Sequence, residues 1–201
     1  MLKKKWSAYK WEAGCDEAGR GCLAGPVVAA AVILSPKENI KGLNDSKKLS
    51  EAKRNILRIE IEEKAHSWAV AFVEPEEIDQ INILNASFKA MHLALELLIK
   101  KPDFILVDGN RFKPFGNTPF ECIVKGDGKS AAIAAASILA KTHRDAYMAK
   151  ISQEFPEYHW QKNKGYPTKK HREAIAEFGI SSQHRKSFTL LPQLELDLKS
   201  A

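Results

Sequence analysis

The chain has 201 residues, of which 44% are hydrophobic, so we predict one domain with a proper core and exclude a largely disordered protein. The formal net charge of +6 suits a polyanionic partner such as nucleic acid, although many basic proteins bind none. The three cysteines lack the spacing of a zinc site and the longest apolar run, 27–34, is too short to span a bilayer, so we expect a soluble, cytoplasmic protein with no membrane partner.

Two strands are predicted at the start, 9–15 and 25–34, with the run Asp16-Glu17-Ala18-Gly19-Arg20-Gly21 between them. Two adjacent carboxylates are therefore expected where a strand gives way to a turn, a place where ligands gather in α/β proteins. Adjacent carboxylates repel each other unless a cation compensates, and oxygen ligands suit Mg²⁺ or Mn²⁺. Glycine amides and an arginine guanidinium suit a phosphate or a hydroxyl. Either feature alone is also typical of an ordinary polar hairpin turn.

Helices and strands alternate along the rest of the chain. After a polar loop at 41–49, Ser50 is expected to cap a helix that runs to about residue 64. A strand is predicted at 65–73, with Trp68, Val70 and Phe72 on one face, and a short turn or helix at 75–79. The next helix has the apolar stripe Leu84, Phe88, Met91, Leu95 and Leu98, and Pro102 ends it. Strands at 104–107 and 120–125, a long alanine-rich helix at 130–150 and a helix at 169–178 that Gly179 stops complete the predicted elements. This order predicts a mixed α/β sheet with helices packed on it, followed by a mostly helical tail.

Three strand ends deliver carboxylates, at Asp16-Glu17, Asp108 and Asp127. Strands of one sheet could bring these ends to a common edge, where two divalent ions would neutralise the four acidic groups. Neighbours on a regular strand point to opposite faces, so the first two carboxylates reach one ion only if the strand ends or bulges there. The glycines of the following turn favour such an ending.

Simpler interpretations of these acidic residues stay open. Taken alone, Asp108-Gly109 and Gly126-Asp127-Gly128 are more typical of turns than of metal ligands. Asp145 is a rival fourth ligand, and its simpler interpretation is a helix-surface ion pair with Lys141, one turn earlier.

Short motifs along the chain resemble those of one family, ribonuclease HII, the bacterial type 2 ribonuclease H. The matching stretches, in the order of that family, are DEAGRG (16–21), AGPVVAAAVIL (24–34), GLNDSKKLS (42–50), EIDQINILNAS (77–87), LVDGN (106–110), VKGD (124–127), AAASILAKTHRD (134–145), KGYPTKKH (164–171) and HRKSF (184–188). They cover roughly residues 13 to 190, and as a set they are highly specific. Cys22 departs from the family, which usually has proline there, and we hypothesise that it confers sensitivity to thiol reagents.

The resemblance implies a ribonuclease-H-like α/β fold, a mixed five-stranded sheet flanked by helices, with a catalytic core at 1–155 and a helical C-terminal extension at 156–201 that contributes to substrate binding. It implies that Asp16, Glu17, Asp108 and Asp127 are the catalytic carboxylates and hold two divalent ions, Mg²⁺ or Mn²⁺. It favours Asp127 over Asp145. The expected partner is nucleic acid, and nothing in the sequence demands more than a monomer.

The resemblance also implies an activity and a set of substrate-binding residues. We expect an endoribonuclease that hydrolyses the RNA strand of RNA–DNA hybrids and incises 5′ to ribonucleotides embedded in duplex DNA, leaving 3′-hydroxyl and 5′-phosphate ends. Gly19, Arg20 and Gly21 would read the 2′-hydroxyl, which separates RNA from DNA, and Tyr166 would stack on the sugar beside the cut. Ser46 and Lys47 would lie near a substrate phosphate, and Lys164 and Arg185 would line a duplex-binding surface together with Lys169, Lys170, His171 and Lys186. His171 and His184 are more typical of structural histidines than of proton carriers.

Two other functions are alternatives to this one. A different metal-dependent nuclease or phosphatase would commonly space its first two acidic residues by one position, whereas Asp16 and Glu17 are adjacent. A non-catalytic module that binds hybrids would tolerate amides at the four acidic positions, and this chain keeps all four carboxylates.

Overall fold

One five-stranded sheet organises the residues that the structure, a computed structural model, describes: 2–35 and 40–191. Its strands are β1 (Glu12–Ala18), β2 (Val27–Ile33), β3 (Ser67–Val73), β4 (Phe104–Asp108) and β5 (Phe120–Ile123). They lie in the order β3-β2-β1-β4-β5; the β1–β2 and β2–β3 pairs are antiparallel, whereas the β1–β4 and β4–β5 pairs are parallel. The predicted mixed five-stranded sheet is confirmed.

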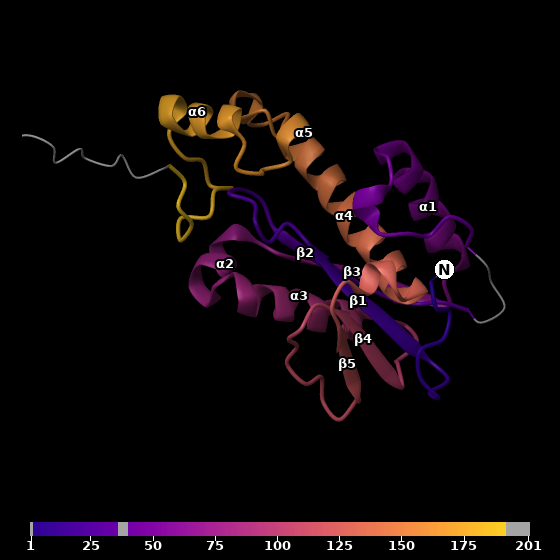
Figure 1. The fold of residues 1–201 in the computed structure, drawn as a ribbon. Helices are drawn as coiled ribbons and strands as arrows, with labels where there is room; N and C mark the ends of the chain where they lie inside the picture. Colours follow the sequence, from indigo (N-terminus) through magenta and orange to yellow (C-terminus); the bar gives the residue numbers. More distant parts are fainter. Residues whose placement is uncertain (1, 36–39, 192–201) are drawn as a thin grey trace, which may run out of the picture.

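Helices cover both faces of this sheet (Figure 1). On one face lie α1 (Glu51–Lys64) and α4 (Ala131–Ile151), and on the other lie α2 (Pro75–Ile81) and α3 (Ile83–Leu97). Single 3₁₀ turns occur at Ser46–Lys48, Gly126–Gly128 and Pro156–Tyr158. The C-terminal part adds α5 (Trp160–Asn163) and α6 (Lys169–Phe178), which ends at Gly179 as predicted.

Two cores result, one on each face, and β2 is wholly buried between them. Such burial explains its unbroken apolar sequence. On the α4 side the packing is very close at Gly14 of β1, where a Cβ atom would lie 2.2 Å from the carbonyl carbon of Ala132. Only glycine fits there, and the alanine-rich start of α4 therefore lies directly against the strand that carries Asp16.

Several predicted boundaries are wrong by a few residues. The first strand begins at Glu12, not at Tyr9, because the backbone amides of Trp6 and Ser7 fold back to donate to the Glu12 carboxylate. Helix α3 ends at Leu97, well before Pro102, and the N–H of its cap residue Leu98 bonds to Leu95. The predicted stripe is buried except at its first member, Leu84, which is half-buried.

The C-terminal extension is helical as predicted and packs through a small core of its own. That core joins the second half of α4 to the extension and to the loop after β1; its buried members are Leu23, Ala24, Met148, Ile151, Tyr158, Trp160, Ala174 and Ile175. The last ten residues of the predicted extension, 192–201, lie outside the described residues. Of the described helices, none is long and apolar enough to cross a membrane.

Candidate active site

The acidic pair lies inside strand β1 and not after it. The pairing with β2 continues without a bulge through Asp16, opposite Ala30, and Glu17, opposite Ala29. The expectation that the strand ends or bulges at this pair is therefore wrong. Because the ladder is regular, the two carboxylates leave opposite faces of the sheet. Asp16 points to the α4 face, where the Ser137 hydroxyl bonds to it.

Asp108 comes next to Asp16 through the parallel pairing of β1 with β4. The last register pair is Cys15 with Val107, so the following residues, Asp16 and Asp108, lie side by side on strands that run about 4.8 Å apart. Asp108 shares the α4 face with Leu106, two residues earlier, which packs on Ile133 of α4. The adjacency follows from strand order alone.

Asp127 lies in the 3₁₀ turn that follows β5. Lys125 precedes the turn in a left-handed conformation, with φ of 55°, and this reverses the chain back toward β4. The Gly126 amide donates to Oδ1 of Asp108 at 2.6 Å, which ties the turn directly to the neighbouring strand. Asp127 itself is buried, and the charges of Asp45 and Lys47 act on it from the loop before α1.

Burial and mutual repulsion raise the pKa of three of these carboxyl groups. For Asp16 burial raises the pKa well above the usual range, and the charges of Glu17 and Asp108 raise it further. Burial likewise raises the pKa of Glu17, opposed by Arg20. For Asp127 burial and the charge of Asp108 act together. The charge of Asp108 raises the pKa of all three groups, so Asp108 is at the centre of the acidic group.

The donor set fits a hard divalent cation. All four groups offer carboxylate oxygens. The raised pKa values of Asp16, Glu17 and Asp127 mean that added positive charge would stabilise the ionised forms of these three. Across residues 2–35 and 40–191, no three His, Cys, Asp or Glu side chains are gathered closely enough to hold a metal ion as they stand. Asp145, the rival ligand, is held by Lys141 at 2.5 Å, which confirms the predicted i,i+4 ion pair.

The glycine hook after β1 has one packed side and one open side. At Gly19 φ is 93°, and a Cβ atom would lie 2.1 Å from Nε of Arg144. At Gly21 a Cβ atom would meet nothing within 4 Å. Arg20 between them is exposed, and its Nη1 donates to Oε1 of Glu17 at 3.1 Å. The fold thus requires glycine at position 19 only, and position 21 faces open space.

Two fully buried arginines hold the hook in place. Arg144 of α4 donates to the carbonyl oxygens of Ala24, Pro26 and Lys164 at 2.8–3.0 Å. Arg185 donates to those of Arg20 and Gly25 at 2.9–3.0 Å. The prediction that Arg185 lines the duplex-binding surface is wrong, because every guanidinium bond that it makes is to an internal carbonyl and its side chain is 0% exposed.

Arg144 is a residue that the sequence reasoning did not single out. It reaches the hook on one side and the turn before Tyr166 on the other, and its guanidinium carbon lies 5.9 Å from the centroid of the Tyr166 ring. Among the described ion pairs, no carboxylate partners it. Gly19, where a Cβ atom would collide with the Arg144 side chain, was the one signal in the sequence.

Tyr166 presents an exposed ring with an anchored hydroxyl. The side chain is 39% exposed, and the hydroxyl donates to the Cys22 sulfur, so burial and this bond raise the pKa of Tyr166. Cys22 is fully buried, and burial raises the pKa of its thiol. The hypothesis of thiol-reagent sensitivity at Cys22 is therefore wrong for the folded protein, since the reactive thiolate is disfavoured and inaccessible.

A buried histidine pair supports the backbone of Tyr166. Trp160 Nε1 donates to Nε2 of His171, so the other ring nitrogen of His171 carries the proton and donates to the Tyr166 carbonyl at 2.9 Å. His184 accepts from the Ser181 amide through Nδ1 and so donates from Nε2 to His171. Both rings are neutral and structural, as predicted, and His171 is not on the binding surface.

The remaining predicted binding residues divide by exposure. Ser46 is buried, and its hydroxyl bonds to that of Ser137 at 2.9 Å, whereas Lys47 is exposed beside it. Lys164 is half-buried in a left-handed conformation, and Lys169 and Lys170 are exposed on α6.

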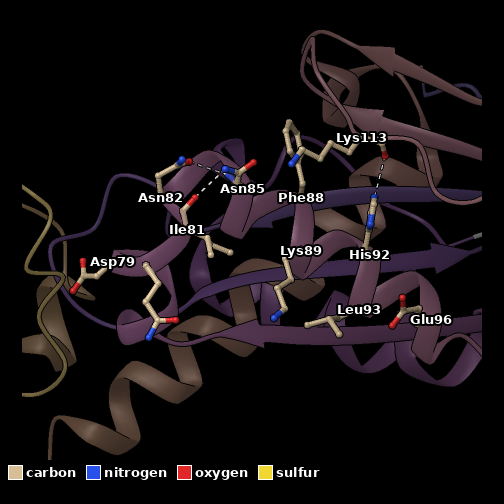
Figure 2. A pocket seen from close by; sticks show the side chains of 11 residues that line it. Asp79, Ile81, Asn82, Asn85, Phe88, Lys89, His92, Leu93, Glu96 and Lys113 are labelled. Atoms are coloured by element: carbon tan, nitrogen blue, oxygen red, sulfur yellow. Dashed lines mark hydrogen bonds between the residues drawn. The ribbon is translucent and has the colours of Figure 1, made fainter.

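A groove of about 810 Å³ lies apart from the carboxylates, along α2 and α3 (Figure 2). Asn82, Asn85, Lys89 and His92 line it together with Lys113 of the loop between β4 and β5. His92 bonds to the Lys113 carbonyl at 2.9 Å and so holds that loop against α3. None of the proposed site residues lines this groove.

Comparison with known proteins decides the family. The family model described as Ribonuclease HII matches residues 13–191. This chain belongs to the ribonuclease HII family. It is 63% identical over 193 residues to the ribonuclease HII of Parabacteroides distasonis. These residues make up 96% of this chain and 97% of that protein.

Solved ribonuclease HII structures share the fold. The chain in the PCNA:RNase HII complex from Archaeoglobus fulgidus is 30% identical, with a TM-score of 0.77 over 94% of this chain and 99% of that one. Ribonuclease H2 from Pyrococcus horikoshii is 28% identical, with a TM-score of 0.75 over 90% and 95%. The predicted ribonuclease-H-like fold is confirmed. The protein is a nuclease of a divalent-metal-dependent family whose ribonuclease HII members act on RNA–DNA hybrids.

The two hook glycines are expected to respond differently to substitution. Gly19→Ala should lower the free energy of unfolding by about 1–3 kcal/mol, because a Cβ atom meets Arg144 and the backbone has positive φ. Gly21→Ala should change it by less than about 0.5 kcal/mol, because that side is open. Urea unfolding of both variants measures this difference, and equal losses would contradict the hook geometry.

The histidine pair predicts a loss of stability in mild acid. Burial lowers the pKa of His184 from 6.5 to about 4, so the unfolded chain takes up a proton below pH 6.5 that the folded chain refuses. This contribution is intact above pH 6.5, and on the order of 2–3 kcal/mol should be lost as the pH falls toward 4. Unfolding free energies of wild type and His184→Gln across that range measure the effect; parallel curves would show that His184 does not titrate on unfolding.

Proposed function

We propose that this ribonuclease HII, besides cutting RNA in RNA–DNA hybrids, incises on the 5′ side of single ribonucleotides embedded in duplex DNA and leaves 3′-hydroxyl and 5′-phosphate ends. The observation that carries the proposal is the adjacency of Asp16 and Asp108 on neighbouring parallel strands, beside a glycine hook whose second glycine is open. The first feature supplies carboxylates for metal, and the second supplies backbone groups for a ribose.

We infer that Asp16, Glu17, Asp108 and Asp127 hold two divalent ions, Mg²⁺ or Mn²⁺. Bound there, the ions would supply Lewis acidity at the attacked phosphodiester and charge for the departing oxygen. The protein holds the carboxylates by its own contacts: the Ser137 hydroxyl bonds to Asp16, Arg20 pairs with Glu17, and the Gly126 amide donates to Asp108. These contacts hold Asp16, Glu17 and Asp108 at one edge of the sheet. The side chains would still have to draw together around the ions, since among the described residues no three such groups are close enough to hold a metal ion as they stand.

The 2′-hydroxyl of the ribonucleotide would be read by the hook at Gly19-Arg20-Gly21. The 2′-hydroxyl both donates and accepts a hydrogen bond, and a backbone without a side chain can approach it closely. Gly21 offers that approach, since a Cβ atom there would meet no protein atom within 4 Å. Arg185 donates to the carbonyl of Arg20 from behind, so the hook is rigid where it would touch the sugar.

Tyr166 would take the sugar of the following nucleotide. Its ring is exposed while its hydroxyl and carbonyl are anchored to Cys22 and His171, so one face is free to stack. A deoxyribose at an RNA–DNA junction would fit against that face better than a ribose, which carries an extra hydroxyl. This preference would make the enzyme able to cut at a lone ribonucleotide.

The C-terminal extension at 156–201 would add a basic surface for the duplex, recognised by shape and backbone. Its exposed lysines, Lys169 and Lys170, and the half-buried Lys164 carry that charge, and Lys47 adds positive charge near Asp127. We propose Lys47 as a phosphate contact and Ser46, which is buried, as a support for Ser137. A monomer in the cytoplasm is the expected working form.

A duplex with one ribonucleotide and an internal label is expected to be incised 5′ to that ribonucleotide in Mg²⁺ or Mn²⁺, and not in EDTA. An all-DNA duplex of the same sequence should stay intact. Asp16→Asn should lower the cleavage rate by about 100-fold or more, because it removes charge where cation binding needs it, while binding stays measurable. Wild-type cleavage by this variant would contradict the ligand assignment.

The matched control compares the two candidates for the fourth carboxylate. Asp127→Asn is expected to resemble Asp16→Asn, whereas Asp145→Asn, which breaks only the ion pair with Lys141, should cut within about threefold of wild type. The reverse order of effects would make Asp145 the ligand.

Tyr166→Ala is expected to lower cleavage at a lone ribonucleotide by about 10-fold or more, and to change cleavage of a uniform RNA–DNA hybrid much less. Tyr166→Phe keeps the ring and loses only the hydroxyl bond to Cys22, so it should retain most of the activity. Initial rates on the two substrates, with a thermal melt of each variant, measure this. Equal, small effects of Tyr166→Ala on both substrates would remove the ring from the site.

A further inference from the structure

The N-terminal arm, residues 2–8, lies outside the part of the chain that the family model matches and runs beside the turn that carries Asp127. The Lys3 amide donates to the Lys129 carbonyl at 2.8 Å, and the Ala131 amide donates to the Lys3 carbonyl at 2.9 Å. The arm therefore forms a short parallel β-bridge with the residues that join the turn to α4.

The second of these bonds takes the place of a helix cap. Ser130 stands at the N-cap position of α4, but its side chain accepts no capping hydrogen bond. The first backbone N–H groups of a helix have no partner within the helix and need one from outside. For Ala131 that partner is the arm, so the arm defines where α4 begins and where the preceding turn ends.

The arm is anchored independently of this bridge. The Trp6 indole packs on the small core of Leu106, Ile123 and Ile133, which lies between β4, β5 and the start of α4. Its Nε1 donates to Glu121 at 3.0 Å, and its backbone amide donates to the buried carboxylate of Glu12 at 2.9 Å. A segment fixed at these points holds its bridge to residues 129–131 in register.

The turn at Gly126–Gly128 is thus held by contacts on two sides. On the sheet side the Gly126 amide donates to Asp108 at 2.6 Å, and Ile133 packs beneath Gly126 so closely that a Cβ atom there would lie 2.6 Å from Cδ1 of Ile133. On the opposite side the arm holds Lys129 and Ala131. Asp127 lies in the chain between Gly126, which the sheet holds, and Lys129, which the arm holds.

We propose that the N-terminal arm is a positioning device for Asp127: the backbone of Lys3 fixes the 3₁₀ turn so that this carboxylate faces Asp108. The proposal rests on the proposed function in one respect, the role of Asp127 as a metal ligand. The bridge itself is independent of that role.

Lys3→Pro tests the device in the full chain, because proline removes the N–H that bonds to Lys129 and leaves the Trp6 anchor in place. Lys4→Pro is the matched control: it places the same restriction one residue later, where the amide makes no described hydrogen bond. Titration with Mn²⁺ alone, followed by the EPR signal of free Mn²⁺, is expected to show binding about threefold to tenfold weaker in Lys3→Pro and unchanged in Lys4→Pro. At saturating Mn²⁺ the KM for hybrid should be the same in both variants.

Hydrogen exchange supplies a readout that needs no metal. In the wild type the Ala131 amide should be protected like the interior of α4. Lys3→Pro keeps the carbonyl that accepts from Ala131 but loses the other bond of the bridge, so the weakened bridge should let the Ala131 amide exchange at least about 10-fold faster. Lys4→Pro keeps the Lys3 N–H and the Lys3 carbonyl and should leave this exchange unchanged. An unprotected Ala131 amide in the wild type would overturn the proposal whatever the variants do, as would equal Mn²⁺ affinity in Lys3→Pro and wild type. If Asp127→Asn binds Mn²⁺ and cuts like wild type, the proposed role of Asp127 fails instead, and with it the purpose assigned to the arm.

Discussion

The repulsion between Asp16 and Asp108 is the constraint around which this molecule is arranged. Strand order makes them neighbours, since β1 and β4 run parallel and their pairing ends one residue earlier. Both carboxylates are on the face that α4 covers, and for Asp16 burial and the neighbouring charges of Glu17 and Asp108 disfavour the ionised form. The surrounding contacts from Ser137 and Gly126 offset only part of that cost, so the fold itself creates a demand for positive charge at this edge.

Beside these carboxylates lies a second group of charged side chains, two buried arginines. Arg144 and Arg185 are buried, and they donate to carbonyl oxygens of Arg20 in the hook, of the segment 24–26 that follows the hook, and of the turn before Tyr166. Guanidinium groups satisfied in this way hold backbone in place through fixed geometry. The carboxylates would handle metal while the arginines shape the surface that meets the sugar, and α4 carries Arg144 as well as Ser137, so the two halves are built on one helix.

The sequence was informative about elements and much less so about their ends and burial. Periodicity located the helices and strands, and motif resemblance indicated the family, but the start of β1 depends on a carboxylate at Glu12 that captures amides five and six residues earlier. The burial of Arg185 could not be predicted, because a basic-aromatic segment is typical of a surface and only the folded chain brings the carbonyls of Arg20 and Gly25 to it. The pairing of Asp16 with Asp108 also depends on strand order, a long-range property. A local motif cannot contain it.

Gly14 limits how this enzyme can change over evolution. Since β1 and α4 touch there through backbone alone, no other residue type can enter position 14 unless the helix moves away from the sheet. A helix that moved would carry Ser137 away from Asp16 and Arg144 away from the hook. Substitutions in α4 are therefore confined to its outer surface. The inner surface of the helix keeps its place only while residue 14 of the facing strand has a hydrogen atom for a side chain.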